Sequence, residues 1–143
     1  MNNWTIRPFR IDDYDGARAL WEASKGIGLD ASDSRDRIEA FLARNAGLSS
    51  VADLDGAIVG AVLCGQDGRR ALVYHLAVAD KHRRQGVGAA LVRACLAKLR
   101  EQGIHKCHIL VFGENHEALL FWKHIGAKER TDLVLSSIDT RAV

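Results

Sequence analysis

The sequence has few of the residues that mark specialised protein classes. Its 143 residues include one proline and three cysteines, and no apolar run approaches the roughly 18 residues that a membrane-spanning helix needs. The charges nearly cancel, with 20 Lys and Arg against 18 Asp and Glu. This balance argues against a general nucleic-acid-binding protein. The overall composition, with 48% hydrophobic and 27% charged residues, 13 Gly and one Pro, excludes disordered and fibrous chains. We expect residues 1–143 to form a single globular domain.

The scarce cysteines and the N-terminal residues bear on the cellular compartment. Cys64, Cys95 and Cys107 have no CxxC spacing and lie in apolar patterns, so we interpret them as small buried hydrophobic residues in a reducing compartment. The opening MNNWTIRPFR lacks the basic and then apolar layout of a signal peptide. We therefore expect a cytoplasmic protein that does not bind membranes.

Hydrophobic periodicity in the first half predicts a strand, two helices and a hairpin. An alternating segment over 4–9 is typical of an edge strand, and a helix with Tyr14 and Trp21 on its apolar face follows. Asp33 or Ser34 caps the second helix. Two apolar runs then flank the dipeptide Asp55-Gly56, and this pattern is typical of a β-hairpin.

The second half continues the alternation of strands and helices. An almost fully apolar run over 71–78 predicts a central strand, and an i, i+4 apolar stripe predicts a helix over 86–102. A buried strand over 106–112, a helix over 115–126 and a last strand over 131–139 complete the order βααβββαβαβ. This order places the chain in the α/β (α+β) class with a mixed sheet.

The stretch DKHRRQGVGAAL brings basic side chains and two glycines to the start of a helix. Gly86 and Gly88 have no Cβ, so phosphate oxygens can approach the backbone N–H groups, and Arg83 or Arg84 adds charge-assisted hydrogen bonds. A dinucleotide fingerprint needs a third glycine where this chain has Leu91, and a P-loop needs a Gly-Lys-Ser/Thr. The turn is therefore either an anion site of another kind or a glycine-containing turn whose basic face is solvated.

The spacing Arg-x-x-Gly-x-Gly after an apolar strand resembles the GCN5-related N-acetyltransferases, in which this motif holds the pyrophosphate of acetyl-coenzyme A. TIRPFRIDDYDGARALW is similar to the family's first strand and helix, and NHEALLFWKHIGA is similar to its C-terminal Asn-x-x-Ala-x-x-Phe-Tyr-x-x-x-Gly-Phe signature. The likeness is closest to small bacterial members resembling ribosomal-protein alanine N-acetyltransferases. It implies a mixed, mostly antiparallel central sheet flanked by about four helices, with two strands splayed apart at the cofactor site.

The resemblance also implies which residues bind acetyl-CoA. Backbone groups of the strand over 71–78 would hold the pantetheine arm where this strand splays from its neighbour, and the glycine-rich turn would hold the pyrophosphate. Asn115 would bind near the splay or cap the following helix, and the two roles are compatible. The expected cofactor-binding residues are Leu76, Ala77, Val78, Arg83, Arg84, Gln85, Gly86, Val87, Gly88, Ala89, Asn115, Ala118 and Phe121.

Two positions depart from the family pattern and affect the expected catalysis. Trp122 stands where relatives carry a tyrosine that protonates the departing thiolate, and an indole N–H does not give up its proton at useful pH. Leu110 stands where relatives often carry a glutamate base. The remaining candidates, Tyr74 and His75, are neighbours on a strand, so we expect them to point to opposite faces. The strand face on which base-carrying relatives place their base favours Tyr74, whereas the ordinary pKa of an imidazole, which lies near neutrality, favours His75.

These features together predict an acetyl-CoA-dependent N-acetyltransferase. The acceptor would be a primary amine, either a protein N-terminus or a small molecule, that attacks the thioester directly in a ternary complex. A non-catalytic acyl-CoA-binding or regulatory domain of the same fold is the alternative, and a basic nucleic-acid module is a distant third. We expect no metal, because His105 and His108 would point to opposite faces of a strand. Either a monomer or a homodimer fits the sequence.

Overall fold

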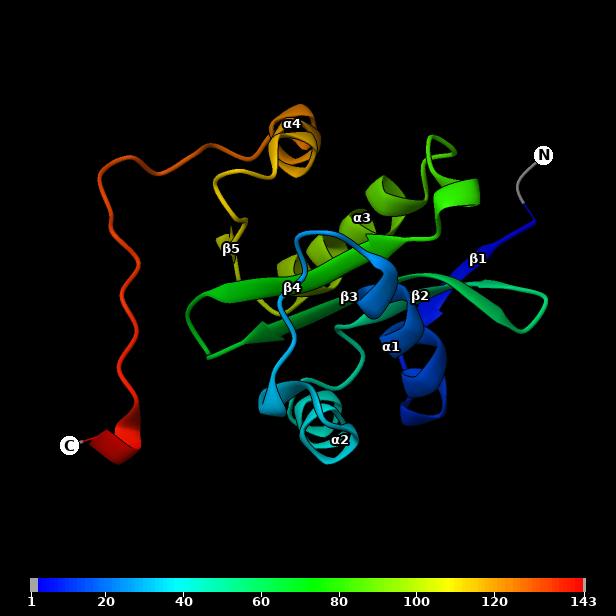
Figure 1. Ribbon diagram of the computed structural model, residues 1–143, viewed down its shortest axis with the longest axis horizontal. Helices are drawn as coiled ribbons and strands as arrows, with labels where there is room; N and C mark the ends of the chain where they lie inside the picture. The colour runs from blue at the N-terminus through cyan, green and yellow to red at the C-terminus, as the bar shows by residue number, and fades with distance from the viewer. Residues whose placement is uncertain (1–2, 143) are drawn as a thin grey trace. The chain divides into compact units, whose positions relative to one another are not determined.

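The computed structural model describes residues 3–142, which form two compact units. The first unit ends at Phe112 and contains a five-stranded sheet with three α-helices, and the second begins at Gly113 and contains one α-helix (Figure 1). None of the helices within these residues is both long enough and apolar enough to span a lipid bilayer.

The sheet of the first unit has the strand order β1-β2-β3-β4-β5. Neighbouring strands are antiparallel except for β4 and β5, which run parallel and are connected through helix α3. This arrangement confirms the mixed, mostly antiparallel sheet and the hairpin expected at Asp55-Gly56. The strands are β1 (Thr5–Pro8), β2 (Ser50–Leu54), β3 (Ala57–Gln66), β4 (Ala71–Val78) and β5 (Cys107–Ile109).

Three helices cover the two faces of this sheet (Figure 1). Helices α1 (Tyr14–Ala23) and α2 (Arg35–Arg44) contribute Trp21 and Ile38 to a core cluster with the odd-numbered β3 residues Ala61 and Leu63. Helix α3 (Val87–Glu101) packs on the opposite face, where the absence of a side chain at Gly60 of β3 admits it. A Cβ there would lie 2.9 Å from Val87 Cγ1 and 3.0 Å from Leu91 Cδ1.

Strands β4 and β5 pair over only part of the length of β4. The register joins Ala71–Val73 to Cys107–Ile109, and β4 then continues to Val78 without β5 beside it. Within the described residues, the β4 edge over 74–78 therefore lacks a strand partner on the β5 side. This opening is the expected splay.

Strand β5 is shorter and more exposed than the predicted buried strand over 106–112. It comprises only Cys107–Ile109, all half-buried, and the apolar side chains of Leu110 and Phe112 beyond it are exposed. The prediction of a buried strand is wrong because β5 lies at the edge of the sheet, where β4 alone pairs with it.

The predicted last strand over 131–139 is absent from the structure. These residues have no regular secondary structure, and Leu133, Val134, Leu135 and Ile138 are exposed. A strand is stable only when a neighbouring strand satisfies its backbone N–H and C=O groups. The described part of the second unit contains helix α4 (His116–Ile125) and a short 3-10 turn, so it offers the segment no strand partner.

Helix α4 forms where the sequence predicts it. Its N-cap is Asn115, whose side-chain oxygen accepts a hydrogen bond from the Ala118 N–H at 3.2 Å. The helix ends at Gly126, whose φ of +117° favours glycine. Between these ends, the rings of Phe121 and Trp122 lie edge to face at 5.3 Å.

An ion-pair network joins the first strand to the rest of the unit. The Arg7 guanidinium donates two hydrogen bonds of 2.8 Å to the Asp13 carboxylate and one of 3.0 Å to Asp53 of β2. Asp13 also accepts a hydrogen bond from the Arg10 N–H. Burial acts to raise the pKa of Asp13, but the bonds from Arg7 and Arg10 outweigh it and hold this pKa below its usual 3.8.

Asp13→Asn should lower the free energy of unfolding by about 1–3 kcal/mol at neutral pH, because Arg7 loses a charged acceptor. The lowered pKa means that Asp13 stabilises the fold fully above its unfolded pKa and less as the pH falls through its folded value. The difference in the free energy of unfolding between Asp13→Asn and the wild type should therefore become smaller at acidic pH. Urea unfolding over a pH series measures it, with the exposed neighbour Asp12→Asn as control. A difference that does not change with pH would contradict the prediction.

Candidate functional site

The chain turns sharply between the end of β4 and the start of α3. A 3-10 turn over Asp80–His82 is followed by Arg84 with φ +63° and by Gly86 with φ +83°. Gly86 is the N-cap of α3, and beyond its two chain neighbours no residue has an atom within 4 Å of the position that a Cβ would take there. The glycine therefore allows the left-handed conformation and leaves open space beside the helix end.

The helix that starts at this turn presents free N–H groups. Its first α-helical bond runs from the Ala90 N–H to the Gly86 carbonyl at 3.0 Å, so the N–H groups of Val87, Gly88 and Ala89 have no acceptor within the helix. The first turn of α3 contains no acidic residue. This helix end carries the positive end of the macrodipole and suits an anion.

Basic side chains surround this helix end. Lys81, Arg83 and Arg84 are exposed, and His82 is half-buried. Arg83 is tied to its own turn, because its Nε lies 3.3 Å from Asp80 Oδ1 and donates a 3.4 Å hydrogen bond to the Val78 carbonyl. Positive charge and exposed N–H groups thus occur together, as the Arg-x-x-Gly-x-Gly spacing predicts.

A small cavity lies between the end of α1 and the end of β4. Its volume is about 160 Å³, and Leu20, Ala23 and Ser24 line one side while Val78, Ala79 and Asp80 line the other. The cavity therefore reaches the residues at which β4 becomes the basic turn.

Strand β4 contains a β-bulge at the centre of the site. Ala61 of β3 pairs with Ala77 and Leu63 pairs with Tyr74, so His75 and Leu76 together face a single β3 residue. His75 has φ +54°, a left-handed conformation in which histidine is enriched among the non-glycine residues.

The bulge places Tyr74 and His75 on the same face of the sheet. The Tyr74 ring lies 6.2 Å from Phe41 of α2, and the His75 ring lies 5.2 Å from Trp21 of α1. The two rings are 6.4 Å apart, and burial raises the pKa of Tyr74. The expectation that they point to opposite faces is wrong, because side chains alternate only along a regular strand.

His75 pairs with a carboxylate that sequence reasoning did not include in the site. Its Nε2 lies 2.8 Å from Asp33 Oδ1, and both side chains are largely buried. Asp33 ends a 3-10 turn over Ala31–Asp33, and Ser34 is the residue that caps α2 by accepting from the Arg37 N–H. No local pattern reveals the pair, because its members are 42 residues apart in sequence.

Two of the three cysteines, Cys64 and Cys107, have raised pKa values that make them unsuited to nucleophilic chemistry. A hydrogen bond with Cys95 and burial raise the pKa of Cys64, and burial and the nearby Cys64 raise the pKa of Cys107 to about 12. Thiols with raised pKa values remain protonated and unreactive near neutral pH. The interpretation as buried residues is confirmed for Cys64 and Cys95, whereas Cys107 is half-buried.

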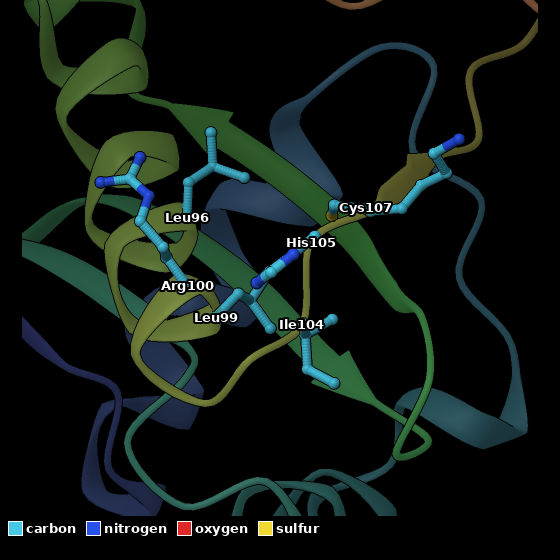
Figure 2. Close-up of a pocket in the computed structure, with 7 residues that line it drawn as sticks. Leu96, Leu99, Arg100, Ile104, His105 and Cys107 are labelled. Atoms are coloured by element: carbon cyan, nitrogen blue, oxygen red, sulfur yellow. The ribbon is translucent and has the colours of Figure 1, made fainter.

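A larger cavity, of about 460 Å³, lies at the other end of α3 (Figure 2). It includes none of the predicted cofactor-binding or catalytic residues. Although His105 borders it, no group of three or more potential metal ligands gathers anywhere within residues 3–142. The cavity is lined by Leu96, Leu99, Arg100, Ile104, His105, Lys106 and Cys107.

The remaining predicted site residues lie in the second unit. Asn115 caps α4, which is one of the two roles expected for it. Ala118 and Phe121 lie on this helix with Trp122, which is buried. Their contribution to cofactor binding or catalysis stays a prediction.

Comparisons with known proteins agree with this geometry. The model of the acetyltransferase (GNAT) family matches residues 14–127. An acetyltransferase of Pectobacterium atrosepticum is 36% identical over 110 residues, 77% of each chain, and one of Sodalis glossinidius is 29% identical over 130 residues, 91% of each. The solved structure of Ard1 from Thermoplasma volcanium is 26% identical, covers 87% of this chain and 82% of its own, and has a TM-score of 0.78. The chain therefore belongs to the acetyltransferase (GNAT) family.

Proposed function

We propose that residues 1–143 act as one N-acetyltransferase domain, which transfers the acetyl group of acetyl-CoA to a primary amine by direct attack in a ternary complex. The observation that carries the proposal is the continuity of the unpaired β4 edge over 74–78 with the positive N-terminal end of α3. An extended arm that contains amide groups can bind along the unpaired edge of β4, and a pyrophosphate can bind at the N-terminal end of α3.

The residues of this region fit acetyl-CoA, which would supply the acetyl group as a thioester. Backbone groups of Leu76, Ala77 and Val78 lie on the unpaired edge and would hold the pantetheine arm. The pyrophosphate would lie against the N–H groups at the glycine-rich turn, where the space beside Gly86 is open. Positive charge nearby comes from Arg83 and Arg84, and the turn as a whole comprises Arg83, Arg84, Gln85, Gly86, Val87, Gly88 and Ala89.

The proposed acceptor is a neutral amine of a peptide N-terminus or of a small molecule. The NatC complex bound to Gag peptide and CoA has the same fold, with a TM-score of 0.75 at 19% identity, and covers 87% of this chain and 84% of its own. In the present chain Leu110 supplies no carboxylate base, so the amine must already be neutral in order to attack. The proton would pass to a group on the α1–α2 face, where Tyr74 and His75 lie.

One observation favours the alternative of a non-catalytic acyl-CoA-binding domain. Trp122 occupies the position of the usual proton-donating tyrosine. A thiol with a pKa of about 8.5 still leaves as the thiolate without assistance, at some loss of rate, so the substitution slows the proposed reaction without preventing it. Turnover of acetyl-CoA with a panel of amines separates the two functions, because a binding domain would release no CoA above background.

CoA alone should raise the melting temperature, and Gly86→Ala should weaken this effect. At a concentration 100-fold above Kd the rise should be roughly 5–10 °C. Gly103→Ala, at the other end of α3, is the matched control, because Gly103 also has a positive φ and open space. Both variants should lose about 1–2 kcal/mol of stability through backbone strain, but only Gly86→Ala should lose CoA affinity. Equal CoA affinity in the two variants would contradict the assignment of the turn.

Gly88→Val should reduce CoA binding for a different reason. Gly88 lies within the first turn of α3 and has no positive φ, so valine needs no left-handed backbone there but would add bulk beside the phosphate position. Affinity should fall at least tenfold, measured by isothermal titration calorimetry. The smaller change Gly88→Ala is the control and should retain most of the affinity. Unchanged affinity in folded Gly88→Val protein would refute a pyrophosphate site here.

Peptide α-amines should be acetylated faster than peptide lysines. At pH 7.4 an α-amine with a pKa of about 7.8 is neutral roughly a quarter of the time, against about 0.1% for lysine at about 10.4. Mass spectrometry of one peptide that carries both groups measures the preference directly. A peptide with a blocked N-terminus is the control and should react slowly. Faster lysine acetylation would show that the site removes a proton from an ammonium group before attack.

A further inference from the structure

The pair formed by Asp33 and His75 is a largely buried polar contact between the bulge of β4 and the turn before α2. His75 Nε2 lies 2.8 Å from Asp33 Oδ1, and the side chains are 17% and 8% exposed. Burying two such groups is unfavourable unless each is held by a specific partner, so this contact defines the orientation of both.

Hydrogen bonds to both the carboxylate and the main-chain carbonyl of Asp33 restrain this residue. Its second carboxylate oxygen accepts a hydrogen bond from the Asp30 N–H at 3.1 Å. Its main-chain carbonyl accepts from the Tyr14 hydroxyl at 2.6 Å and from the Arg18 guanidinium at 3.2 Å. The short 3-10 turn is thereby fastened to α1, and one carboxylate oxygen is left directed at His75.

His75 is restrained as firmly through its backbone. The Trp21 indole N–H donates a 2.8 Å hydrogen bond to the His75 carbonyl, and the two rings lie 5.2 Å apart. The left-handed conformation at the bulge directs the imidazole toward Asp33 rather than to the other face of the sheet. The imidazole is therefore held by contacts at both its backbone and its ring.

An ionised carboxylate accepts hydrogen bonds and donates none, so the short contact requires a hydrogen on Nε2 of His75. In the neutral ring the lone pair then lies on Nδ1. We infer that Asp33 is a positioning residue that holds His75 in the Nε2–H tautomer, so that Nδ1 accepts the proton which the attacking amine gives up. This inference rests on the proposed acetyl transfer.

The proton transfer balances without any further reagent. The amine nitrogen forms a bond to the acetyl carbon as the carbon–sulfur bond breaks, and its proton passes to His75 Nδ1. The imidazolium then returns the proton through solvent to the departing thiolate, which leaves as the CoA thiol. His75 would thus supply the proton that Trp122 does not, and Asp33 would stabilise the imidazolium between the two steps.

The tautomer is measured directly on the protein without ligands. Long-range ¹H–¹⁵N NMR spectra of the histidine rings at alkaline pH distinguish Nε2–H from Nδ1–H, and His75→Asn identifies which signals belong to His75. The wild type should show the Nε2–H form. Asp33→Asn should show the Nδ1–H form or a mixture, because an amide can also donate a hydrogen bond. An Nδ1–H ring in the wild type, or no change in Asp33→Asn, would overturn the inference.

Kinetics then test whether the orientation matters for the reaction. Asp33→Asn should lower kcat by roughly 10–100-fold while KM for acetyl-CoA changes less than about twofold, since acid–base catalysis contributes on this scale. Asp53→Asn, which removes the same charge from the Arg7 network, is the control and should leave kcat unchanged. Unchanged kcat in folded Asp33→Asn protein would restrict the pair to a structural role and overturn the inference.

A second variant keeps the test decisive if Asp33→Asn does not fold. His75→Asn retains a residue that accepts a left-handed conformation, so it should fold and lose the same 10–100-fold in kcat. Full kcat in His75→Asn would overturn the inference. Absence of transfer to every amine in the wild type would instead contradict the proposed function, while the NMR result would still report how Asp33 orients the ring.

Discussion

The site of the first unit depends on the bulge in β4, where two residues occupy the space of one. Up to Val73 the strand pairs on both sides, with β3 and with β5, and it contributes to a regular sheet. From Tyr74 onward β4 pairs with β3 alone, and the next residue, His75, takes a left-handed conformation. Because a bulge increases the local twist of a strand, it is the natural place for β4 to part from its other neighbour. An unpaired backbone edge within a sheet results.

The same bulge links the sheet to the helices that cover it. The carbonyl and the ring of His75 both face α1 and the turn before α2, where Trp21 and Asp33 hold them. The contacts are between residues far apart in the chain, so they form only when the helices have packed on the sheet. The geometry of the proposed proton acceptor is thus coupled to the core formed by α1, α2 and β3.

The proposed anion site is more local in origin. A left-handed glycine, the free N–H groups of one helix turn and adjacent basic side chains all come from residues 80–89. Such a site needs little from the remainder of the fold except the strand that leads into it. The proton transfers of the proposed reaction have fewer groups to support them, because neither Leu110 nor Trp122 exchanges a proton. A reaction at this site therefore depends on the state of the incoming amine and on groups carried by β4.

Several features could be predicted from the sequence because neighbouring residues cause them. The hairpin follows from Asp55-Gly56, the start of α4 follows from the cap at Asn115, and the glycine-rich turn follows from its spacing after an apolar strand. The expectation that Tyr74 and His75 diverge failed because nothing in a run of strand-forming residues reveals a bulge. The prediction of a strand over 131–139 is wrong because a strand-like sequence pattern shows only that a segment can pair. Whether it pairs depends on the presence of a partner strand. The sequence by itself thus determined the local elements and the glycine-rich turn, since those depend on backbone conformation and short-range hydrogen bonds. Only the tertiary structure decided the pairing of Asp33 with His75, because packing of α1 and its following turn on the sheet is what brings two residues 42 positions apart into contact.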